Sequence, residues 1–501
     1  MHKKGFSTEK YLAAQTKAIL ERVSRFDKLY LEFGGKLLTD MHAARVLPGY
    51  EFDAKTKVLQ SLKEEAEFFY CVCAKDLQKG RVRHDFGLSY DALTIKEVND
   101  MEELGLEVTA IVISRFDGEA AAERFRNKLL NMGKKVYMTP EVKGYLENMD
   151  RLVGEEGFGR YPRISSKKRI VVVTGAGGGS GKMSTCLSQL YHDAKNKVKS
   201  GYAKFETFPI WNLPLKHPVN VAYEAATADL LDANLIDKFH LKAYGIEAVN
   251  YNRDIENFDI IKTLLDKIVD KDNFVATYKS PTDMGVNRAK EGIIDDETCQ
   301  EAGRQEVLRR YFRYRKEFFD GIEPMATLNR MDTLMEKLGI RPEDRKVVAP
   351  AREAGKGSEG KGGVGCGAAI ELKDGMIVTG KSSRLLHAAT SAVLNAVKTT
   401  AGIPDDIDII SESVIESVKR MHSEILDAKF GSLNLEEVLV ALAISSQTNP
   451  TAKKALTMLK ELRGCEMHLS KAPSRGDDAG MKKLKVNATY DVVLSQDKNG
   501  K

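Results

Sequence analysis

The sequence lacks long hydrophobic runs and long blocks of like charge. No apolar segment approaches the ~20 residues that a membrane-spanning helix needs, and the opening residues Met1–Glu9 lack the apolar stretch of a signal peptide. The 77 basic and 72 acidic residues give a net charge of +5 and are interspersed along the chain. Because nucleic-acid binders usually concentrate their basic residues, we expect a cytoplasmic protein that binds neither membranes nor nucleic acids.

Cysteine is also sparse, with six residues scattered over 501 positions. This distribution is typical of reduced thiols in a cytoplasm and not of a disulfide framework. Cys71 and Cys73 stand in the apolar run Phe68–Ala74. We expect both thiols to be buried in a core strand.

The chain does contain enough apolar residues for more than one core. Hydrophobic residues make up 42% of it and charged residues 30%, which is ordinary for a globular protein. A chain of 501 residues is too long for one ordinary core. We predict three domains, at residues 1–225, 226–345 and 346–501, and a homo-oligomer, the latter from the size of the chain and its many helices.

The first ~165 residues alternate between strand and helix patterns, which favours a mostly parallel sheet. We therefore predict an α/β protein with a Rossmann-like sheet, followed by a helix-rich middle region and a C-terminal α/β domain. The expected strands are Lys28–Phe33, Glu67–Ala74, Leu106–Ser114, Lys134–Met138 and Arg169–Thr174, and the expected helices are Ala54–Ala66, Leu93–Leu104 and Gly118–Met132.

The most informative segment runs from Arg169 to Tyr191. Its pattern predicts a buried strand, a turn with five glycines in seven residues, and an amphipathic helix. Glycines let the backbone approach an anion closely, and a helix start supplies free N–H groups and partial positive charge. A tight strand-to-helix turn is the alternative, although such a turn needs only one or two glycines. The residues predicted to bind phosphate are Gly175, Gly177, Gly179, Ser180, Gly181, Lys182, Ser184 and Thr185.

Known phosphate-binding motifs match this loop only in part. A Walker A loop reads G-x-x-x-x-G-K-[ST], but here Ala176 replaces its first glycine and Met183 its hydroxyl residue. The dinucleotide motif G-x-G-x-x-G is also incomplete, because Ser180 stands in its last position. We infer a ligand that carries phosphate, with ATP or another nucleotide and Mg²⁺ as the candidate cofactor.

Ionisable residues cluster after the loop. The segment Tyr202–Pro218 holds three prolines in ten residues and the only tryptophan, and proline spacing favours an extended path that presents side chains at a pocket mouth. Cations there would neutralise phosphate, and carboxylates would bind Mg²⁺ or act as bases. Surface charge is the alternative for each residue. The catalytic candidates are Lys204, Glu206, His217 and Asp283.

The last third of the chain predicts a second α/β arrangement. The stretch Gly355–Gly367 has seven glycines in thirteen residues and precedes a strand, so we interpret it as a flexible loop or hinge, with a ligand-binding role as the alternative. The segment Ala368–Thr379 predicts a hairpin that turns at Asp374-Gly375. Further helices are expected at Ser411–Lys429, Asn434–Ser445 and Thr451–Arg463, and strands at Glu466–Ser470 and Leu484–Val493.

Blocks spread along the chain carry a family resemblance. They are Leu29–Lys36, His42–Gly49, Cys186–His192, Tyr202–Asp229, Tyr251–Asp254, Tyr278–Asn287 and Cys366–Lys381. Together they resemble a bacterial family of conserved proteins catalogued only as a domain of unknown function. The resemblance covers nearly the whole chain and implies no established activity. Relatives tend to have prolines at the positions of Ala176 and Gly178, so the loop of this chain has more conformational freedom.

The C-terminal part also resembles the cytidine-deaminase-like fold, in which a hairpin leads into a helix that opens with His-Ala-Glu. The corresponding residues here are His387, Ala388 and Ala389, so alanine replaces the acid–base glutamate, and no Pro-Cys-x-x-Cys follows. Cys465 and His468 are three residues apart on an expected strand and would point to opposite faces. We expect neither deaminase chemistry nor zinc, and His387 either caps a helix or contacts a ligand.

These observations predict a cytosolic enzyme that acts on a phosphorylated small molecule or nucleotide, with ATP-dependent transfer or ligation as the preferred reaction. The loop would bind phosphate, Lys182 would offset its charge, and residues 202–287 would complete the pocket. The alternative is a non-catalytic oligomeric regulator that binds a nucleotide or metabolite. A purely structural oligomer would leave the Gly175–Lys182 loop unexplained.

Overall fold

The computed structural model describes residues 3–35, 37–83, 87–142, 149–356, 365–425 and 432–492. The chain divides into two compact units, one of Lys4–Gly303 and one of Arg304–Lys501 with Met1–Lys3. The division falls inside helix α13 (Asp296–Phe319), within the segment that the sequence assigns to a middle region. Each unit has a sheet of its own.

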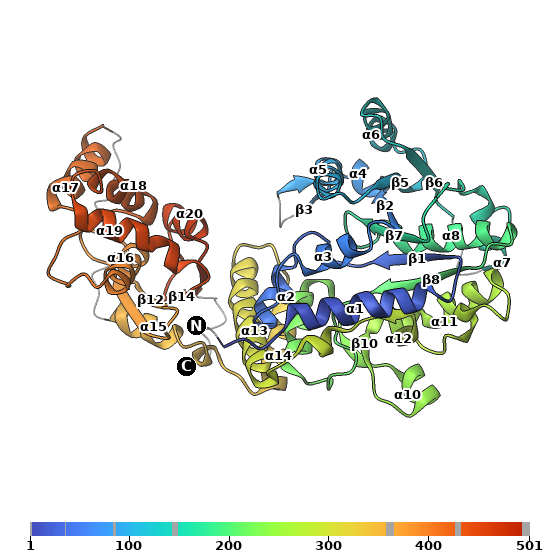
Figure 1. Ribbon diagram of the computed structural model, residues 1–501. Helices are drawn as coiled ribbons and strands as arrows, with labels where there is room; N and C mark the ends of the chain where they lie inside the picture. The colour runs from blue at the N-terminus through green and yellow to red at the C-terminus, as the bar shows by residue number, and fades with distance from the viewer. Residues whose placement is uncertain are drawn as a thin grey trace. The chain divides into compact units, whose positions relative to one another are not determined.

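The first unit is built on a seven-stranded parallel sheet, as the sequence predicted (Figure 1). Its strand order is β11-β8-β1-β7-β2-β5-β6. Strands β2 and β7 lie inside the sheet and are apolar and almost wholly buried, as expected for parallel strands covered on both faces. The strands are β1 (Lys28–Phe33), β2 (Ala66–Cys73), β5 (Val108–Phe116), β6 (Val136–Pro140), β7 (Ile170–Gly175), β8 (Ser200–Phe205) and β11 (Gly285–Val286).

All five strands predicted for this sheet are present, with bounds that differ by no more than two residues. Two strands were missed. Strand β8 overlaps the start of the Tyr202–Pro218 segment, where the proline spacing suggested an extended loop and not a strand, and β11 is only two residues long. Cys71 and Cys73 are buried in β2, as predicted. All six cysteines lie in the described part of the chain and are free thiols.

Helices cover both faces of the sheet. The chain moves from β1 to β2 and on to β5 and β6 in one direction, and from β7 to β8 and β11 in the other. Because crossovers between parallel strands are right-handed, the two directions place their helices on opposite faces. The helices on one face are α2 (Met41–Val46), α3 (Ala54–Ser61), α4 (Ala74–Gln78), α5 (Tyr90–Glu103) and α6 (Ala120–Asn131). Helix α1 (Thr8–Val23) packs against α3 of this group. The helices on the other face are α8 (Lys182–Lys195) and α11 (Asn252–Ile268).

Shorter elements complete the first unit. Strands β3 (Val82–Arg83) and β4 (Leu88–Ser89) form one small hairpin, and β9 (Asn234–Ile236) pairs with β10 (Val249–Tyr251) in another. The remaining helices are α7 (Met149–Leu152), α9 (Pro218–Ala226), α10 (Lys238–Tyr244) and α12 (Pro281–Met284).

The second unit contains a mixed four-stranded sheet of order β13-β12-β14-β15. The predicted hairpin is present, since β12 (Gly367–Glu371) pairs antiparallel with β13 (Ile377–Lys381). The strand predicted at Leu484–Val493 is shorter, because Leu484 ends a helix and β15 covers Asn487–Tyr490 beside β14 (Glu466–Leu469). The helices are α14 (Met325–Leu338), α15 (Val348–Lys356), α16 (Ala388–Ala401), α17 (Glu412–Arg420), α18 (Leu435–Ser445), α19 (Pro450–Met458) and α20 (Arg475–Leu484).

Parts of three predictions lie outside the described residues. They are residues 357–364 of the predicted hinge, residues 426–429 of the helix predicted at Ser411–Lys429, and Val493 at the end of the last predicted strand.

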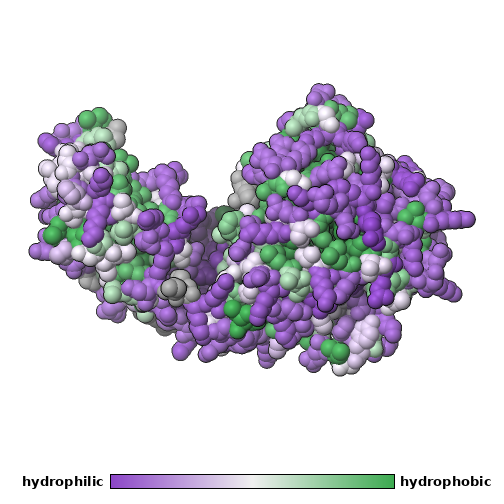
Figure 2. Space-filling model, viewed as in Figure 1, coloured by the Kyte–Doolittle hydropathy of each residue, from purple (hydrophilic) through white to green (hydrophobic). Residues whose placement is uncertain are grey.

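Hydrophilic residues cover most of the face shown in Figure 2, and hydrophobic residues form smaller patches between them. No helix in the described part of the chain is both long enough and apolar enough to cross a membrane.

A buried arginine joins the strands of the second sheet. The Arg345 side chain is 1% exposed. Its Nε donates to Thr489 Oγ1 at 3.0 Å, and its Nη2 donates to the carbonyl oxygens of Asn487 at 2.8 Å and Met467 at 3.1 Å. Its Nη1 forms an ion pair with Glu466. One guanidinium thus fixes β14 against β15.

We expect Arg345→Leu to lower the free energy of unfolding of the second unit by about 3 kcal/mol, because two carbonyls lose their buried donor and Glu466 keeps only one of its two arginine partners, Arg309. Hydrogen exchange should become faster in β14 and β15 and stay unchanged in the sheet of the first unit. The matched control is Lys346→Ala, since Lys346 is 67% exposed in its ion pair with Glu371. Equal exchange in the two variants would contradict this role of Arg345.

Candidate functional site

The glycine loop follows β7 at the carboxyl edge of the large sheet. Strand β7 lies between β1 and β2. The chain leaves β7 towards β8, on the far side of β1, whereas it leaves β1 and β2 in the opposite direction. Open parallel sheets bind ligands at such switch points, outside the carboxyl ends of the strands. The loop therefore occupies the position that this fold class most often uses for a ligand.

Three of the loop glycines have a packing reason. A Cβ atom at Gly175, Gly177 or Gly181 would overlap a neighbouring atom, and Gly181 also has a φ of +92°. The overlaps would be with the Cys71 carbonyl oxygen at 2.3 Å, the Tyr90 hydroxyl at 2.8 Å and the Ser114 Cβ at 2.5 Å, respectively. These contacts are what a tight strand-to-helix turn requires.

The two glycines in between have no such contacts. A Cβ atom at Gly178 or Gly179 would meet nothing within 4 Å, and only Gly179 has a positive φ, of +74°. Packing therefore leaves Gly178 unexplained, and the tip of the loop faces open space. An open tip with bare backbone is what a phosphate cradle needs.

Helix α8 begins without a side-chain cap. Its N-cap residue is Gly181, which has no side chain to accept from the first N–H groups. Helices α1, α2 and α10 of the same unit start with side chains that accept such hydrogen bonds, whereas α3, α5, α6 and α11 start without one, as α8 does. The first N–H groups of α8 and the positive end of its dipole are therefore not offset by a capping side chain.

Lys182 lies folded over the loop. Its Nζ donates to the Gly177 carbonyl oxygen at 3.0 Å and lies 3.5 Å from Ser180 Oγ. Thr185 is buried, with its Oγ1 3.5 Å from Cys71 Sγ, so its hydroxyl faces the core. Ser184 is half-buried in the first turn of α8. The structure thus brings all eight predicted phosphate-binding residues into one loop and helix start, while the ammonium group stays within the loop.

A row of polar side chains runs beside the loop on the face covered by α8. Lys204 on β8 and Glu206, the residue after β8, are two positions apart and lie on the same face, and Glu32 on β1 pairs in register with Lys204. Lys204 Nζ donates to Asp254 Oδ1 at 2.7 Å, and the Tyr202 hydroxyl donates to Glu32 at 2.6 Å. We call Glu32, Lys204, Glu206 and Asp254 the acidic row, because it has three carboxyl groups and one ammonium group.

The acidic row perturbs the pKa of its members. Burial raises the pKa of Glu206 to about 8; the charges of Asp254 and Glu32 act in the same direction, and Lys204 opposes them. Burial alone would lower the pKa of Lys204, but Asp254, Glu32 and Glu206 outweigh it and raise that pKa. Glu206 is therefore protonated near neutral pH and is placed to give or take a proton.

The acidic row lies within reach of a ligand on the loop. In the sheet register, Glu32 is opposite Val173 on one side and Lys204 on the other, so Gly175 and Glu206 end their strands at the same level. The two strands are separated by β1, and neighbouring strands are ~4.8 Å apart, which places the two backbones roughly 10 Å apart. A small phosphorylated molecule spans that distance.

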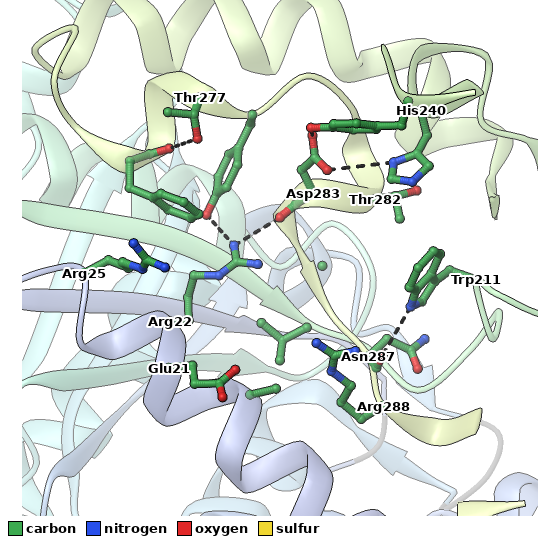
Figure 3. Close-up of a pocket in the computed structure, with 16 residues that line it drawn as sticks. Glu21, Arg22, Arg25, Trp211, His240, Thr277, Thr282, Asp283, Asn287 and Arg288 are labelled. Carbon is green, nitrogen blue, oxygen red and sulfur yellow. Dashed lines mark hydrogen bonds and ion pairs between the residues drawn. The ribbon is translucent and has the colours of Figure 1, made fainter. Parts of the chain in front are cut away.

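The other two catalytic candidates have structural partners elsewhere. The His217 ring caps α9, since its Nδ1 accepts from the Val219 N–H at 3.3 Å, and its Nε2 lies 3.0 Å from Asp296 Oδ1. Asp283 forms a capping box at the start of α12 with Ser280. Its Oδ2 accepts from the Lys279 N–H at 2.8 Å, and the residue lines a cavity that Figure 3 shows. That both side chains also act chemically stays a prediction.

Sequence reasoning missed Glu32, Asp40 and Lys55. Glu32 could have been found, because it is the only charged residue between Leu29 and Phe33, in a strand that is otherwise apolar. Asp40 and Lys55 form an ion pair of 2.6 Å after β1, with their side chains only 10% and 7% exposed. Lys55 contacts the same segment, since a Cβ atom at Gly35 would lie 3.7 Å from its Nζ. No sequence pattern links these two positions.

The second unit has its own polar cavity. His387 is the N-cap residue of α16, but its ring makes no capping hydrogen bond. Its Nδ1 lies 2.7 Å from Asp477 Oδ2, and the ring lines a cavity of about 460 Å³ together with His422 and Lys419. Among the described residues, no group of three or more His, Cys, Asp or Glu side chains is placed to hold a metal ion.

We expect Glu206→Gln to change how stability depends on pH. The pKa of this carboxyl rises from 4.5 in the unfolded chain to about 8, so between these values the native state keeps a proton that the unfolded state releases. Wild-type stability therefore falls as pH rises through this window. The variant should gain about 4 kcal/mol over the wild type at pH 8, and little at pH 4.5.

Urea denaturation between pH 4.5 and 8.5 measures this difference. Glu256→Gln, an exposed carboxyl on α11, is the control and should follow the wild type. If the wild type and Glu206→Gln give parallel profiles, the carboxyl of Glu206 is not protonated in the folded protein at neutral pH.

Comparison with known proteins places the whole chain in one family. Residues 4–339 match the family model described as "Domain of unknown function DUF1846, N-terminal", and residues 343–499 match its C-terminal counterpart. A "UPF0371 protein" of Clostridium botulinum strain Alaska E43 / Type E3 is 49% identical over 490 residues, which are 97% of each chain. The protein of the same name from strain Langeland / NCTC 10281 / Type F is 48% identical over the same share. The chain therefore belongs to the family described as domain of unknown function DUF1846, as its sequence blocks indicated.

Proposed function

We propose that the protein is an enzyme that binds a phosphorylated small molecule or nucleotide on the Gly175–Lys182 loop and transfers or ligates a group at the acidic row. The uncapped start of α8 carries this proposal. It combines free N–H groups, the positive end of a helix dipole and an open loop tip at the switch point of the sheet.

In this proposal Lys182 changes partner when the ligand binds. Its ammonium group leaves the Gly177 carbonyl oxygen and the Ser180 hydroxyl, and pairs with a phosphate oxygen. The exchange replaces a neutral carbonyl acceptor by a charged phosphate oxygen, which makes the stronger hydrogen bond. The preferred ligand is ATP with Mg²⁺.

The ion would be held mainly by phosphate oxygens and water, as Mg²⁺ often is in nucleotide sites. Thr185 Oγ1 faces the core, which leaves the Ser184 hydroxyl as the nearest candidate ligand from the helix. Glu206 is the acid or base, and Lys204 orients the carboxylate of Asp254.

The alternative is a non-catalytic regulator that binds the same ligand. The loop supports both functions equally, and the acidic row favours the enzyme. A raised pKa on a buried carboxyl beside a ligand position is more useful to proton transfer than to binding alone.

A thermal-shift screen tests the loop. ATP, ADP, pyrophosphate and sugar phosphates, each with and without Mg²⁺, should include a ligand that raises Tm by about 2 °C at tenfold its Kd. Lys182→Ala should weaken that ligand about tenfold, because an ammonium–phosphate pair is lost. Lys195→Ala, at the other end of α8, is the control and should leave the affinity unchanged. Equal affinity in Lys182→Ala and wild type would exclude the loop as the phosphate site.

A turnover assay on the ligand so identified separates enzyme from regulator. Phosphorus NMR should show consumption of the ligand by the wild type in the presence of a cosubstrate panel of amines, carboxylates and alcohols. Glu206→Gln should lower kcat about a hundredfold while the thermal shift is kept, because general acid–base catalysis is lost and binding is not. Binding by the wild type without any turnover would favour the regulator.

A further inference from the structure

A second cavity in the first unit lies away from the glycine loop. It has a volume of about 430 Å³ and lies between α1, the segment Phe274–Arg288 and Trp211 (Figure 3). This volume is in the range of sites for small organic ligands. Neither the loop nor its proposed phosphate ligand accounts for this cavity.

Three arginine side chains line it. Arg22 Nη1 donates to the Tyr278 hydroxyl at 2.6 Å and to the Asp283 carbonyl oxygen at 3.0 Å, which holds its guanidinium at the cavity wall. The other N–H groups of Arg22 have no partner among the described residues. Figure 3 shows Arg288 entering the same space from the segment after β11.

Arg25 is the least engaged of the three. Its guanidinium carbon lies 5.3 Å from the Phe274 ring centroid, and no carboxylate in the described part of the chain pairs with it. Arg288 pairs only with the partly exposed Glu291, at 3.3 Å. Positive charge in the cavity is therefore available to a ligand.

The acidic side chains of the cavity do not cancel this charge. Asp283 is engaged in the capping box of α12 and in a 2.9 Å hydrogen bond from the Tyr244 hydroxyl. The Glu21 side chain is 61% exposed and lies 3.9 Å from Lys17 Nζ. An incoming anion would thus meet three guanidinium groups, of which only that of Arg288 pairs with a carboxylate in the described part of the chain, the partly exposed Glu291.

The side of the cavity formed by Trp211 and His240 consists of flat rings. The ring centroids of Trp211 and His240 are 5.8 Å apart, and those of His240 and Tyr244 are 4.7 Å apart. Trp211 Nε1 donates to the Asn287 carbonyl oxygen at 3.2 Å, and His240 Nδ1 lies 3.0 Å from Ser280 Oγ. These bonds fix the two rings, and fixed rings favour a planar ligand.

We propose that this cavity binds a small molecule that carries a phosphate or carboxylate group on a planar ring. The guanidinium groups of Arg22, Arg25 and Arg288 bind the anion, and the ring packs against Trp211 and Tyr244. The site is separate from the glycine loop, and its existence does not depend on the function proposed for that loop.

The cavity is close to the acidic row through the backbone of β11. Gly285 lines the cavity, and a Cβ atom on it would lie 2.6 Å from Glu206 Oε2. A ligand bound here is therefore separated from Glu206 by one strand that has no side chain at this point.

Intrinsic fluorescence reports on this site directly, because Trp211 is the only tryptophan of the chain. The probes are phenyl phosphate and benzoate, which carry the two anions on one planar ring, and inorganic phosphate, which has no ring. At least one ring-bearing probe should change the fluorescence of Trp211 in a saturable manner. Inorganic phosphate should bind about tenfold more weakly, since it lacks the ring contacts.

Arg25→Ala should weaken the ring-bearing probe about fivefold, as expected for loss of a partly exposed charge-assisted contact. Lys17→Ala, which removes an exposed cation of α1, is the matched control and should bind as the wild type does. Lys182→Ala should also bind as the wild type does, which separates this result from that of the glycine loop. Arg288→Ala serves as a second variant, and circular dichroism verifies that each protein is folded.

Two results would overturn the proposal. One is the absence of a saturable fluorescence change with either ring-bearing probe up to 20 mM, which is about the weakest affinity of interest for such small ligands. The other is wild-type affinity in both Arg25→Ala and Arg288→Ala.

Discussion

The contact between the end of β7 and the end of β2 determines where the glycine loop and the start of α8 lie in the first unit. The Ala176 N–H donates to the Cys71 carbonyl oxygen at 3.0 Å, and Gly175 leaves no room for a side chain against the same oxygen. The chain then reaches α8 at Gly181, beside Ser114 of β5. The start of α8 is thus fixed relative to three strands, and with it the direction in which its free N–H groups point.

Charge balance links this position to the acidic row. Lys204 is the only cation of the row and is already bound to Asp254, so Glu32 and Glu206 share no further positive group. Two additional buried carboxylates would be costly, and a proton on Glu206 removes one of the charges. Loss of the proton from Glu206 would therefore change the net charge of the acidic row near neutral pH, and a group that titrates near neutral pH is what acid–base catalysis requires.

The strands and the loop could be predicted from the sequence because each depends on neighbouring residues. Buried parallel strands are mostly apolar, so β1, β2 and β7 could be predicted to within a residue or two. The acidic row could not be assembled in this way, since Glu32 and Lys204 come together only through the β1–β8 register. Two capping roles were readable but missed: His217 precedes Pro218 at the first position of α9, and Ser280-Pro-Thr-Asp283 is a capping-box pattern.

Gly285, in the edge strand β11, lies between the acidic row and the arginine-lined cavity. Strand β11 has only two residues, and its glycine faces the carboxyl of Glu206 on one side while it lines the arginine-bearing cavity on the other. A side chain at this position would displace the carboxyl of Glu206 from its present place. Because Gly285 has no side chain, only the backbone of β11 lies between the carboxyl of Glu206 and the cavity that Gly285 lines.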